Sequence, residues 1–95
     1  MADIKALLVS DDNEEYIYDV DVDESGSSTT HRVTLSFDDY ENMTSSDIEP
    51  EELIKRSFDF LLERESKESI KSEFNLKEVV DLFPEYEEEV LNQLL

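Results

Sequence analysis

The chain has 95 residues, of which 27 are Asp or Glu and 8 are Lys or Arg, giving a formal net charge of −19 at pH 7. This length predicts one domain spanning 1–95, near the smallest size that buries its own core. The charge excludes a direct nucleic-acid binder held by phosphate contacts and disfavours an anionic membrane surface, and the absence of cysteine excludes disulfides and thiolate metal sites.

Strands are predicted in the first part of the chain. Residues 3–9 alternate weakly between polar and apolar types and predict a first strand. Over 16–23, Tyr and Val alternate with Ile and Asp, which is the two-residue period of a half-buried strand. Residues 24–29 contain the single glycine and predict a hairpin loop, and the alternation over 33–37 predicts the second strand of that hairpin.

The apolar pattern also predicts how these two strands pair. Placing Val22 opposite His31 brings every apolar residue of the hairpin onto one face. The other face then gains an ion pair between Asp21 and Arg32. In this register the single histidine, His31, is expected at a solvent-facing strand end.

Pairing of residues 3–9 with the first strand of the hairpin predicts a three-stranded antiparallel meander. In that arrangement Ile4, Leu8 and Ile17 are expected to form a small apolar patch on the outer face of the sheet. This patch and the last helix are the two surfaces on which a dimer would bury apolar area.

Helices are predicted in the second part of the chain. The expected organisation is a sheet over 1–38, a polar linker over 39–49 and a helical region over 50–95. Within that region the expected helices are Pro50–Arg64, a short helix over 66–74, a third helix over 76–83 that begins with a capping-box analogue and ends before a proline, and a last helix over 84–95. The fold class is therefore α+β, with a two- or three-stranded antiparallel meander followed by three to four helices on one sheet face.

The helix that begins at Pro50 is expected to be central. On a helical wheel its apolar residues cover an arc of about 200°. One neighbour cannot cover so wide an arc, so packing is expected on two sides, with Leu61 in the core. The hairpin would cover one side and the later helices the other.

Few residues carry a recognisable catalytic or metal-binding pattern. Asp19, Asp21 and Asp23 have the spacing that opens a calcium loop, but Glu24 stands at the glycine position and Thr30 at the closing glutamate position. The histidine has no partner in a known motif, and a single glycine rules out glycine-rich phosphate loops. The interpretation is that the protein is not an enzyme and has no cofactor and no metal.

A partner surface is the more plausible functional feature. The strand acids Asp19, Asp21 and Asp23 are expected on the solvated face. Tyr40 lies in the predicted linker and Phe60 on the margin of the central helix arc. Aromatic side chains beside acids are common at protein interfaces, so these five residues are the candidate surface.

The segment from Ser57 onward contains SFDFLLERE, KESI and FPEYE. With these motifs the chain resembles small uncharacterised prokaryotic proteins that share an SFxFLLERE…KESI…FPEYE segment. The resemblance covers about a third of the chain and implies no function, site or cofactor.

Three hypotheses arise for the function of a soluble cytoplasmic protein of this kind. The first is a non-catalytic protein–protein interaction or regulatory module whose acidic surface binds a basic protein. The second is a nucleic-acid mimic that inhibits a DNA-binding protein or toxin, although alternate strand residues repeat at about 6.6 Å and DNA phosphates at about 3.4 Å along each strand. The third is that the acidity serves only solubility or a high-salt medium.

Overall fold

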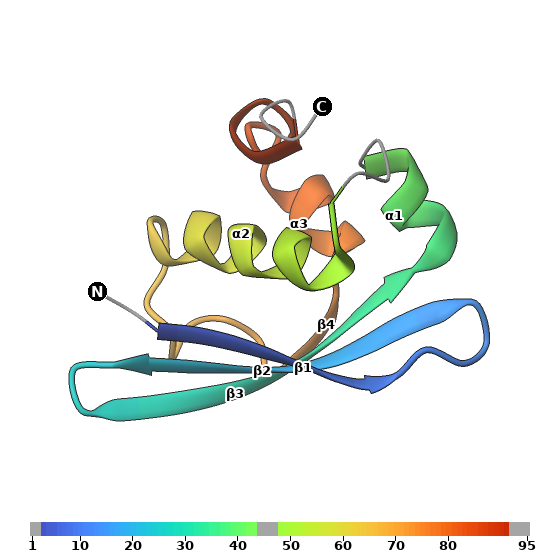
Figure 1. The fold of residues 1–95 in the computed structure, drawn as a ribbon. Coiled ribbons are helices and arrows are strands. Elements are labelled where there is room, and N and C mark those ends of the chain that lie inside the picture. The colour runs from blue at the N-terminus through green and yellow to red at the C-terminus, as the bar shows by residue number, and fades with distance from the viewer. Residues whose placement is uncertain (1–2, 44–47, 92–95) are drawn as a thin grey trace.

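The computed structural model describes residues 3–43 and 48–91. The elements in chain order are β1 (Asp3–Ser10), β2 (Glu15–Glu24), β3 (Ser27–Ser36), α1 (Phe37–Met43), α2 (Pro50–Leu62), β4 (Glu73–Asn75), α3 (Lys77–Leu82) and a π-helical turn, η1 (Glu87–Leu91). The strands form one sheet in the order β1-β2-β3-β4, and the helices lie on one side of it (Figure 1).

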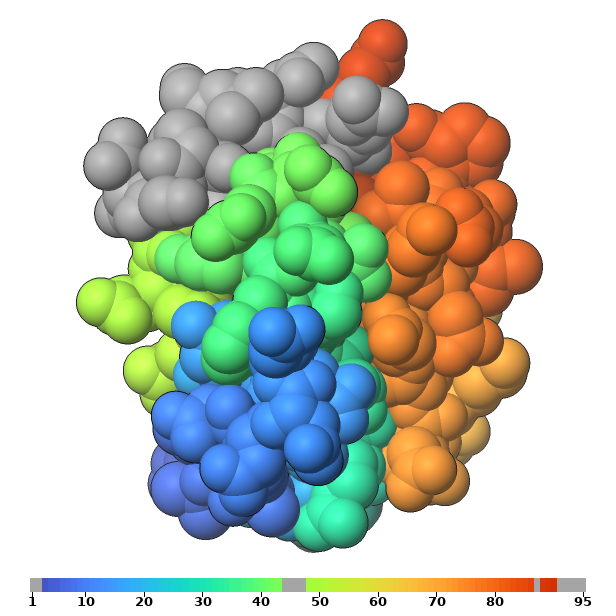
Figure 2. All heavy atoms as spheres, turned by 90° about the vertical axis from the view of Figure 1, so that its right-hand side faces the viewer, coloured from blue at the N-terminus to red at the C-terminus, as the bar shows by residue number. Residues whose placement is uncertain are grey.

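The α+β class predicted from the sequence is confirmed, but the sheet is mixed and larger than expected. Strands β1, β2 and β3 form an antiparallel meander, and β4 then joins β3 in parallel. The prediction of only two or three strands is therefore wrong. Figure 2 shows the N-terminal strands at one side of the molecule and the segment that contains β4 and α3 at the other.

The turn between β2 and β3 is tighter than predicted. Only Ser25 and Gly26 separate the strands, in place of the six-residue loop expected over 24–29. Both residues have positive φ, 55° and 82°. Two successive positive φ values match the right-handed twist of the flanking strands, which favours a two-residue hairpin turn. The hairpin consequently pairs along the full length of both strands.

The predicted register of this hairpin is wrong by two residues. His31 lies opposite Val20, not opposite Val22. A shift of two residues leaves every side chain on its predicted face, because successive strand residues alternate between faces. The shift does change the ion pair on the outer face, where Arg32 lies opposite Asp19 and not Asp21.

The new register places His31 in the core, so the expected solvent-facing position is also wrong. The residue is 2% exposed. Its Nδ1 lies 2.7 Å from the carbonyl oxygen of Lys71, and its Nε2 lies 2.8 Å from Oγ1 of Thr29. The carbonyl can only accept, so Nδ1 donates to it, and Nε2 forms its hydrogen bond with the threonine hydroxyl, which can donate or accept. His31 is thus a satisfied core histidine that ties β3 to the loop before β4.

Strand β1 pairs with β2 as predicted, but the expected outer-face apolar patch does not form. Ile4 lies opposite Val22, and Leu8 lies opposite Tyr18. Since Val22 and Tyr18 are buried core residues, Ile4 and Leu8 lie on the core face of the sheet. Ile17 lies on the opposite face, because it follows the alternate set of β2 positions.

Helix α1 occupies residues that were predicted to be the end of a strand and the start of a linker. Oγ of Ser36 accepts a hydrogen bond of 3.1 Å from the backbone N–H of Asp39, which caps the first turn. The Phe37 ring lies 4.7 Å from the ring of Tyr16, and Met43 is buried. The linker predicted over 39–49 therefore includes the second part of a helix that packs on the sheet.

Helix α2 is the central element that its apolar arc predicted. Its buried residues are Pro50, Leu53, Ile54, Ser57, Phe58, Phe60 and Leu61. On the sheet side the Phe58 ring lies 5.4 Å from His31 and 5.9 Å from Phe74. On the other side the Phe60 ring lies 5.6 Å from Phe83 and 5.2 Å from Tyr86. The expected two-sided packing is confirmed.

The short helix predicted over 66–74 is wrong. The chain makes a turn at 67–69 and then forms β4, in which Phe74 lies opposite Val33 of β3. Backbone hydrogen bonds of 2.7 Å from Arg32 to Ser72 and 2.9 Å from Leu76 to Thr34 extend this pairing. The open edge of β3 thus provides backbone partners that a helix would have supplied internally.

Helix α3 begins and ends near its predicted positions, whereas the predicted last helix is represented by the π-helical turn η1, which begins at Glu87 and not at residue 84. The carboxylate of Glu78 accepts a 2.8 Å hydrogen bond from the N–H of Asn75, which confirms the capping-box analogue. Helix α3 ends before Phe83, next to Pro84. The last helix was predicted over 84–95, and its residues 92–95 lie outside the described residues.

Candidate functional site

The three predicted strand acids lie on the exposed outer face of the sheet. The Arg32 guanidinium lies 2.9 Å from the carboxylate of Asp19, and this hydrogen bond lowers the pKa of Asp19. Asp21 accepts a 2.8 Å hydrogen bond from the hydroxyl of Thr30. Asp23 is exposed at the hairpin end. Two of the three acids are thus engaged within the sheet.

The two predicted aromatic contact residues lie elsewhere. Tyr40 is half-buried on α1, where its ring meets Tyr16 edge-on and its hydroxyl donates to the Ile48 carbonyl. Phe60 is only 4% exposed and belongs to the core. The structure therefore does not bring the five predicted residues together into one surface.

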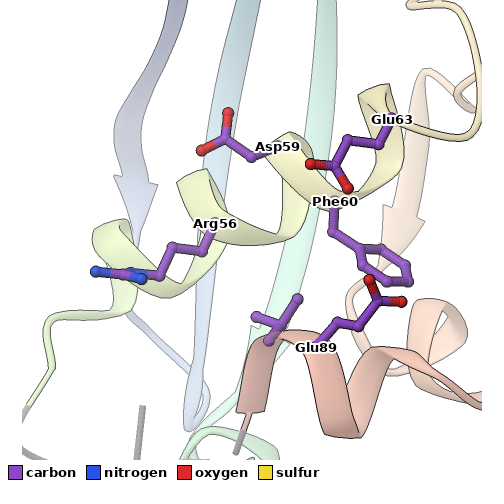
Figure 3. Close-up of a pocket in the computed structure, with 6 residues that line it drawn as sticks. Arg56, Asp59, Phe60, Glu63 and Glu89 are labelled. Atoms are coloured by element: carbon purple, nitrogen blue, oxygen red, sulfur yellow. The ribbon is translucent and has the colours of Figure 1, made fainter. Parts of the chain in front are cut away.

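A pocket does form around the edge of Phe60, between α2 and η1. Its volume is about 270 Å³, and its lining residues are Arg56, Asp59, Phe60, Glu63, Glu89 and Val90. Figure 3 shows Phe60 reaching from α2 toward the C-terminal helical turn, with the carboxylate of Glu89 near its ring and that of Glu63 near the start of its side chain. The Arg56 side chain points away from that ring. Carboxylates and an aromatic floor thus face a common space.

The side chain of Arg64 is a cation that is already bound beside this pocket. Its guanidinium carbon lies 3.7 Å from the centroid of the Phe60 ring, which is a cation–π contact. Nε of Arg64 lies 3.8 Å from a carboxylate oxygen of Glu85, Nη1 lies 3.5 Å from one of Glu63, and Nη2 donates to Glu89. The molecule's own guanidinium is therefore held between an aromatic face and three carboxylates, and it joins α2 to the C-terminal segment.

Carboxylates remain in excess around the pocket after these pairings. Arg56 pairs with Glu52 at 3.1 Å. Burial, together with the charges of Glu63 and Glu52, raises the pKa of Asp59 even though Arg56 opposes the shift. Three acids line the pocket, Asp59, Glu63 and Glu89, against one arginine, Arg56. Such a site favours an ammonium or guanidinium group as its occupant.

Sequence reasoning missed this pocket, although one signal pointed to it. Asp59 and Glu63 are four residues apart, as are Glu85 and Glu89. Like charges at this spacing share one helix face and repel each other, so each pair indicates a surface of concentrated negative potential. The two faces meet because Phe60 packs against Tyr86, and the spacing of the acids alone does not reveal this packing.

A second hollow lies between the end of α2, the loop before β4 and α3. Its volume is about 120 Å³, and its walls include Leu61, Phe74 and Phe83. Leu82, which is 67% exposed, stands at its margin. The lining is more apolar than that of the first pocket and offers less charge for recognition.

Within residues 3–43 and 48–91, no three His, Asp or Glu side chains are grouped so that they would hold a metal ion. In the same part of the chain, no helix has the length and apolar character needed to cross a membrane. Comparison with protein-family models, with curated proteins and with solved structures found no match. The chemistry of the pocket between α2 and η1 is therefore the main indication of a binding function in the described residues.

Proposed function

We propose that this chain is a non-catalytic protein–protein interaction or regulatory module that binds a basic protein partner in the cytoplasm. The observation that carries the proposal is the pocket between α2 and η1. There an aromatic face and three carboxylates already hold the guanidinium of Arg64, and Asp59 adds a further carboxylate to the adjoining space. A lysine or arginine side chain of a partner would find the same chemistry in that space.

The net charge of −19 supports the same proposal at longer range. An excess of one sign raises the rate of encounter with an oppositely charged protein and makes that rate depend on salt. Contacts in the pocket would then fix the orientation of the complex, because a guanidinium or ammonium group must be aligned with specific carboxylates.

Two contacts favour an interaction module over a nucleic-acid mimic. A mimic needs a row of unpaired charges that follows the phosphate spacing of DNA. The most regular row in the chain is formed by Asp19, Asp21 and Asp23, but Arg32 neutralises the first of them and Thr30 hydrogen-bonds the second. The concentrated negative charge lies instead in a pocket, which suits single basic side chains.

The proposal is tested by titrating the protein with a short arginine-rich peptide while recording backbone amide shifts by NMR. The expected result is a set of shifts on α2 and η1 that weakens as salt is added. The double variant D59N/E63Q should weaken binding at least fivefold. A matched control, E41Q/D81N, removes the same charge from exposed positions on α1 and α3 and should change affinity less than twofold.

Equal losses in the two double variants would show that only total charge matters, and would refute a specific site. Shifts spread evenly over the outer face of the sheet would have the same meaning. Unchanged binding in D59N/E63Q would exclude the pocket altogether.

A further inference from the structure

Strand β1 presents an open edge to solvent. It has eight residues and is the first strand in the sheet order, so among the described residues it pairs only with β2. Three consecutive apolar side chains are exposed along it: Leu7 at 71%, Leu8 at 46% and Val9 at 46%. Long edge strands with apolar side chains are templates for pairing with another strand, and natural proteins normally protect them.

The protection of this edge is incomplete. One lysine, Lys5, lies in the strand, and the register of β1 against β2 shifts between Leu8 and Ser10, which marks a bulge at Val9. The stretch before the bulge, Asp3–Leu8, keeps a continuous register with β2. An incoming strand therefore has a regular backbone edge along most of β1.

The charges at the two ends of β1 define what fits this edge. At its N-terminal end Asp3 lies opposite Asp23 of β2. At its C-terminal end the chain continues into the exposed acids Asp11 and Asp12. Apart from Lys5, the centre of the strand is apolar, and acids flank it on both sides, Asp3 at its start and Asp11 and Asp12 just beyond its end. A complementary strand therefore has apolar residues in the middle and basic residues at each end.

A second copy of this chain does not have that character. In an antiparallel pair of β1 strands, the Asp3 end of one copy meets the Asp11–Asp12 end of the other, so acids face acids at both ends. Each copy also carries a net charge of −19, which opposes their approach. The charge pattern thus favours a basic partner over self-association.

We propose that the open edge of β1 binds an extended segment of a basic protein as a fifth strand of the sheet. Main-chain hydrogen bonds would supply affinity, and basic residues at both ends of the segment would supply selection. This inference rests on the proposed function in that the partner is basic, but it places the contact on a different surface from the pocket between α2 and η1.

The test uses the full chain and a blocked synthetic peptide, acetyl-Lys-Lys-Val-Thr-Val-Ile-Val-Lys-Lys-amide. The expected result is that amides of β1 shift and exchange more slowly with solvent when the peptide binds. Two further peptides of the same sequence have alternate backbone nitrogens methylated, one at the odd positions and the other at the even positions. The peptide whose methyl groups lie on the nitrogens that face β1 should bind at least tenfold more weakly. That comparison leaves the protein unaltered, so protein misfolding cannot produce it.

A pair of protein variants provides the second measurement. Leu7→Lys adds a base to the edge and should weaken peptide binding at least tenfold. Leu82→Lys makes the same change at another exposed leucine, on α3, and should change the affinity less than twofold. Equal effects of the two variants would overturn the inference.

The remaining outcomes separate this inference from the proposed function. Peptide shifts confined to α2 and η1, and lost in D59N/E63Q, would uphold the pocket and refute the β1 edge. If the peptide binds neither at the pocket nor at the β1 edge, both the proposed function and this inference are refuted. A dimer that forms without peptide and is abolished by Leu7→Lys would show that the occupant is a second copy, which also refutes the inference.

Discussion

The buried hydroxyl groups of Ser57 and Tyr86 should stabilise the attachment of the C-terminal segment to α2. Both residues are 0% exposed. The Tyr86 hydroxyl lies 2.5 Å from Oγ of Ser57, which lies 2.8 Å from the carbonyl oxygen of Leu53. The carbonyl can only accept, so Ser57 donates to Leu53 and Tyr86 donates to Ser57. Tyr86 therefore depends on Ser57 for its hydrogen bond, whereas Ser57 retains a partner without Tyr86.

This asymmetry gives different expected losses for the two single variants. Ser57→Ala leaves a buried phenol without an acceptor and should cost about 1–3 kcal/mol. Tyr86→Phe removes the donor and should cost about 0.5–1.5 kcal/mol. In the double variant no phenol is stranded, so its loss should be smaller than the sum of the two single losses by about 1 kcal/mol.

The assay is urea unfolding at neutral pH, followed by circular dichroism, for the wild type, the two single variants and the double variant. Ser28→Ala, at an exposed position of β3, is a control and should change the free energy of unfolding by less than about 0.5 kcal/mol. Additivity of the Ser57 and Tyr86 losses within about 0.3 kcal/mol would refute the hydrogen-bond geometry on which the reasoning rests.

Tyr86 also makes a pH-dependent contribution to the free energy of unfolding. Burial raises the pKa of Tyr86 to about 12 from 10.0. The unfolded chain therefore loses the phenol proton first, so the stabilisation is complete below pH 10 and is lost as the pH rises to about 12. Two pH units correspond to about 2–3 kcal/mol. The stability of the wild type relative to Tyr86→Phe should fall by that amount between pH 9 and pH 12, and a constant difference would contradict the burial of the phenol.

The remaining expectations concern the core, the turn and the acidic surface. Leu61→Ala should cost about 2–5 kcal/mol in chemical unfolding, and a loss below about 1 kcal/mol would mean that α2 is not central. Gly26→Ala, at a φ of 82°, should destabilise by about 1 kcal/mol in the same assay, whereas an unchanged midpoint would argue against the two-residue turn. Because the pKa of Asp59 is raised, its ionised form opposes folding, so Asp59→Asn should raise the melting temperature at pH 7 but not at pH 3. Moderate salt should raise the wild-type melting temperature by screening repulsion; a flat or falling trend would show that the acids are already compensated.

The sequence predicts faces of this fold better than it predicts pairings. The wide apolar arc of α2 requires two neighbours, and Phe58 and Phe60 do contact different layers. The alternation in the hairpin fixes which side chains point inward. It does not distinguish registers that differ by two residues, because these have identical faces, and so it misplaced His31. The register is set by the two-residue turn, which the alternation pattern did not predict.

Strand β4 and the turn before it could not be assigned from local pattern for a different reason. Ile70 and Phe74 are four residues apart, which fits one face of a helix, and both are buried as predicted. Their backbone nevertheless follows the turn and strand geometry imposed by the open edge of β3, a long-range effect. Helix α1, by contrast, had a local signal, since Ser36 is followed three residues later by Asp39, the spacing of a capped first turn. The pocket between α2 and η1 also depends on long-range packing.

The long sequence separation between β3 and β4 has a consequence for how the chain reaches its native state. The whole of residues 37–72 separates β3 from β4, so this pairing must wait for a long loop to close. Until then the nascent meander has two open edges, and partly folded chains with open edges tend to join one another. Mutual repulsion between chains of charge −19 opposes such joining. The excess of acidic residues therefore slows association between partly folded chains until β4 pairs with β3.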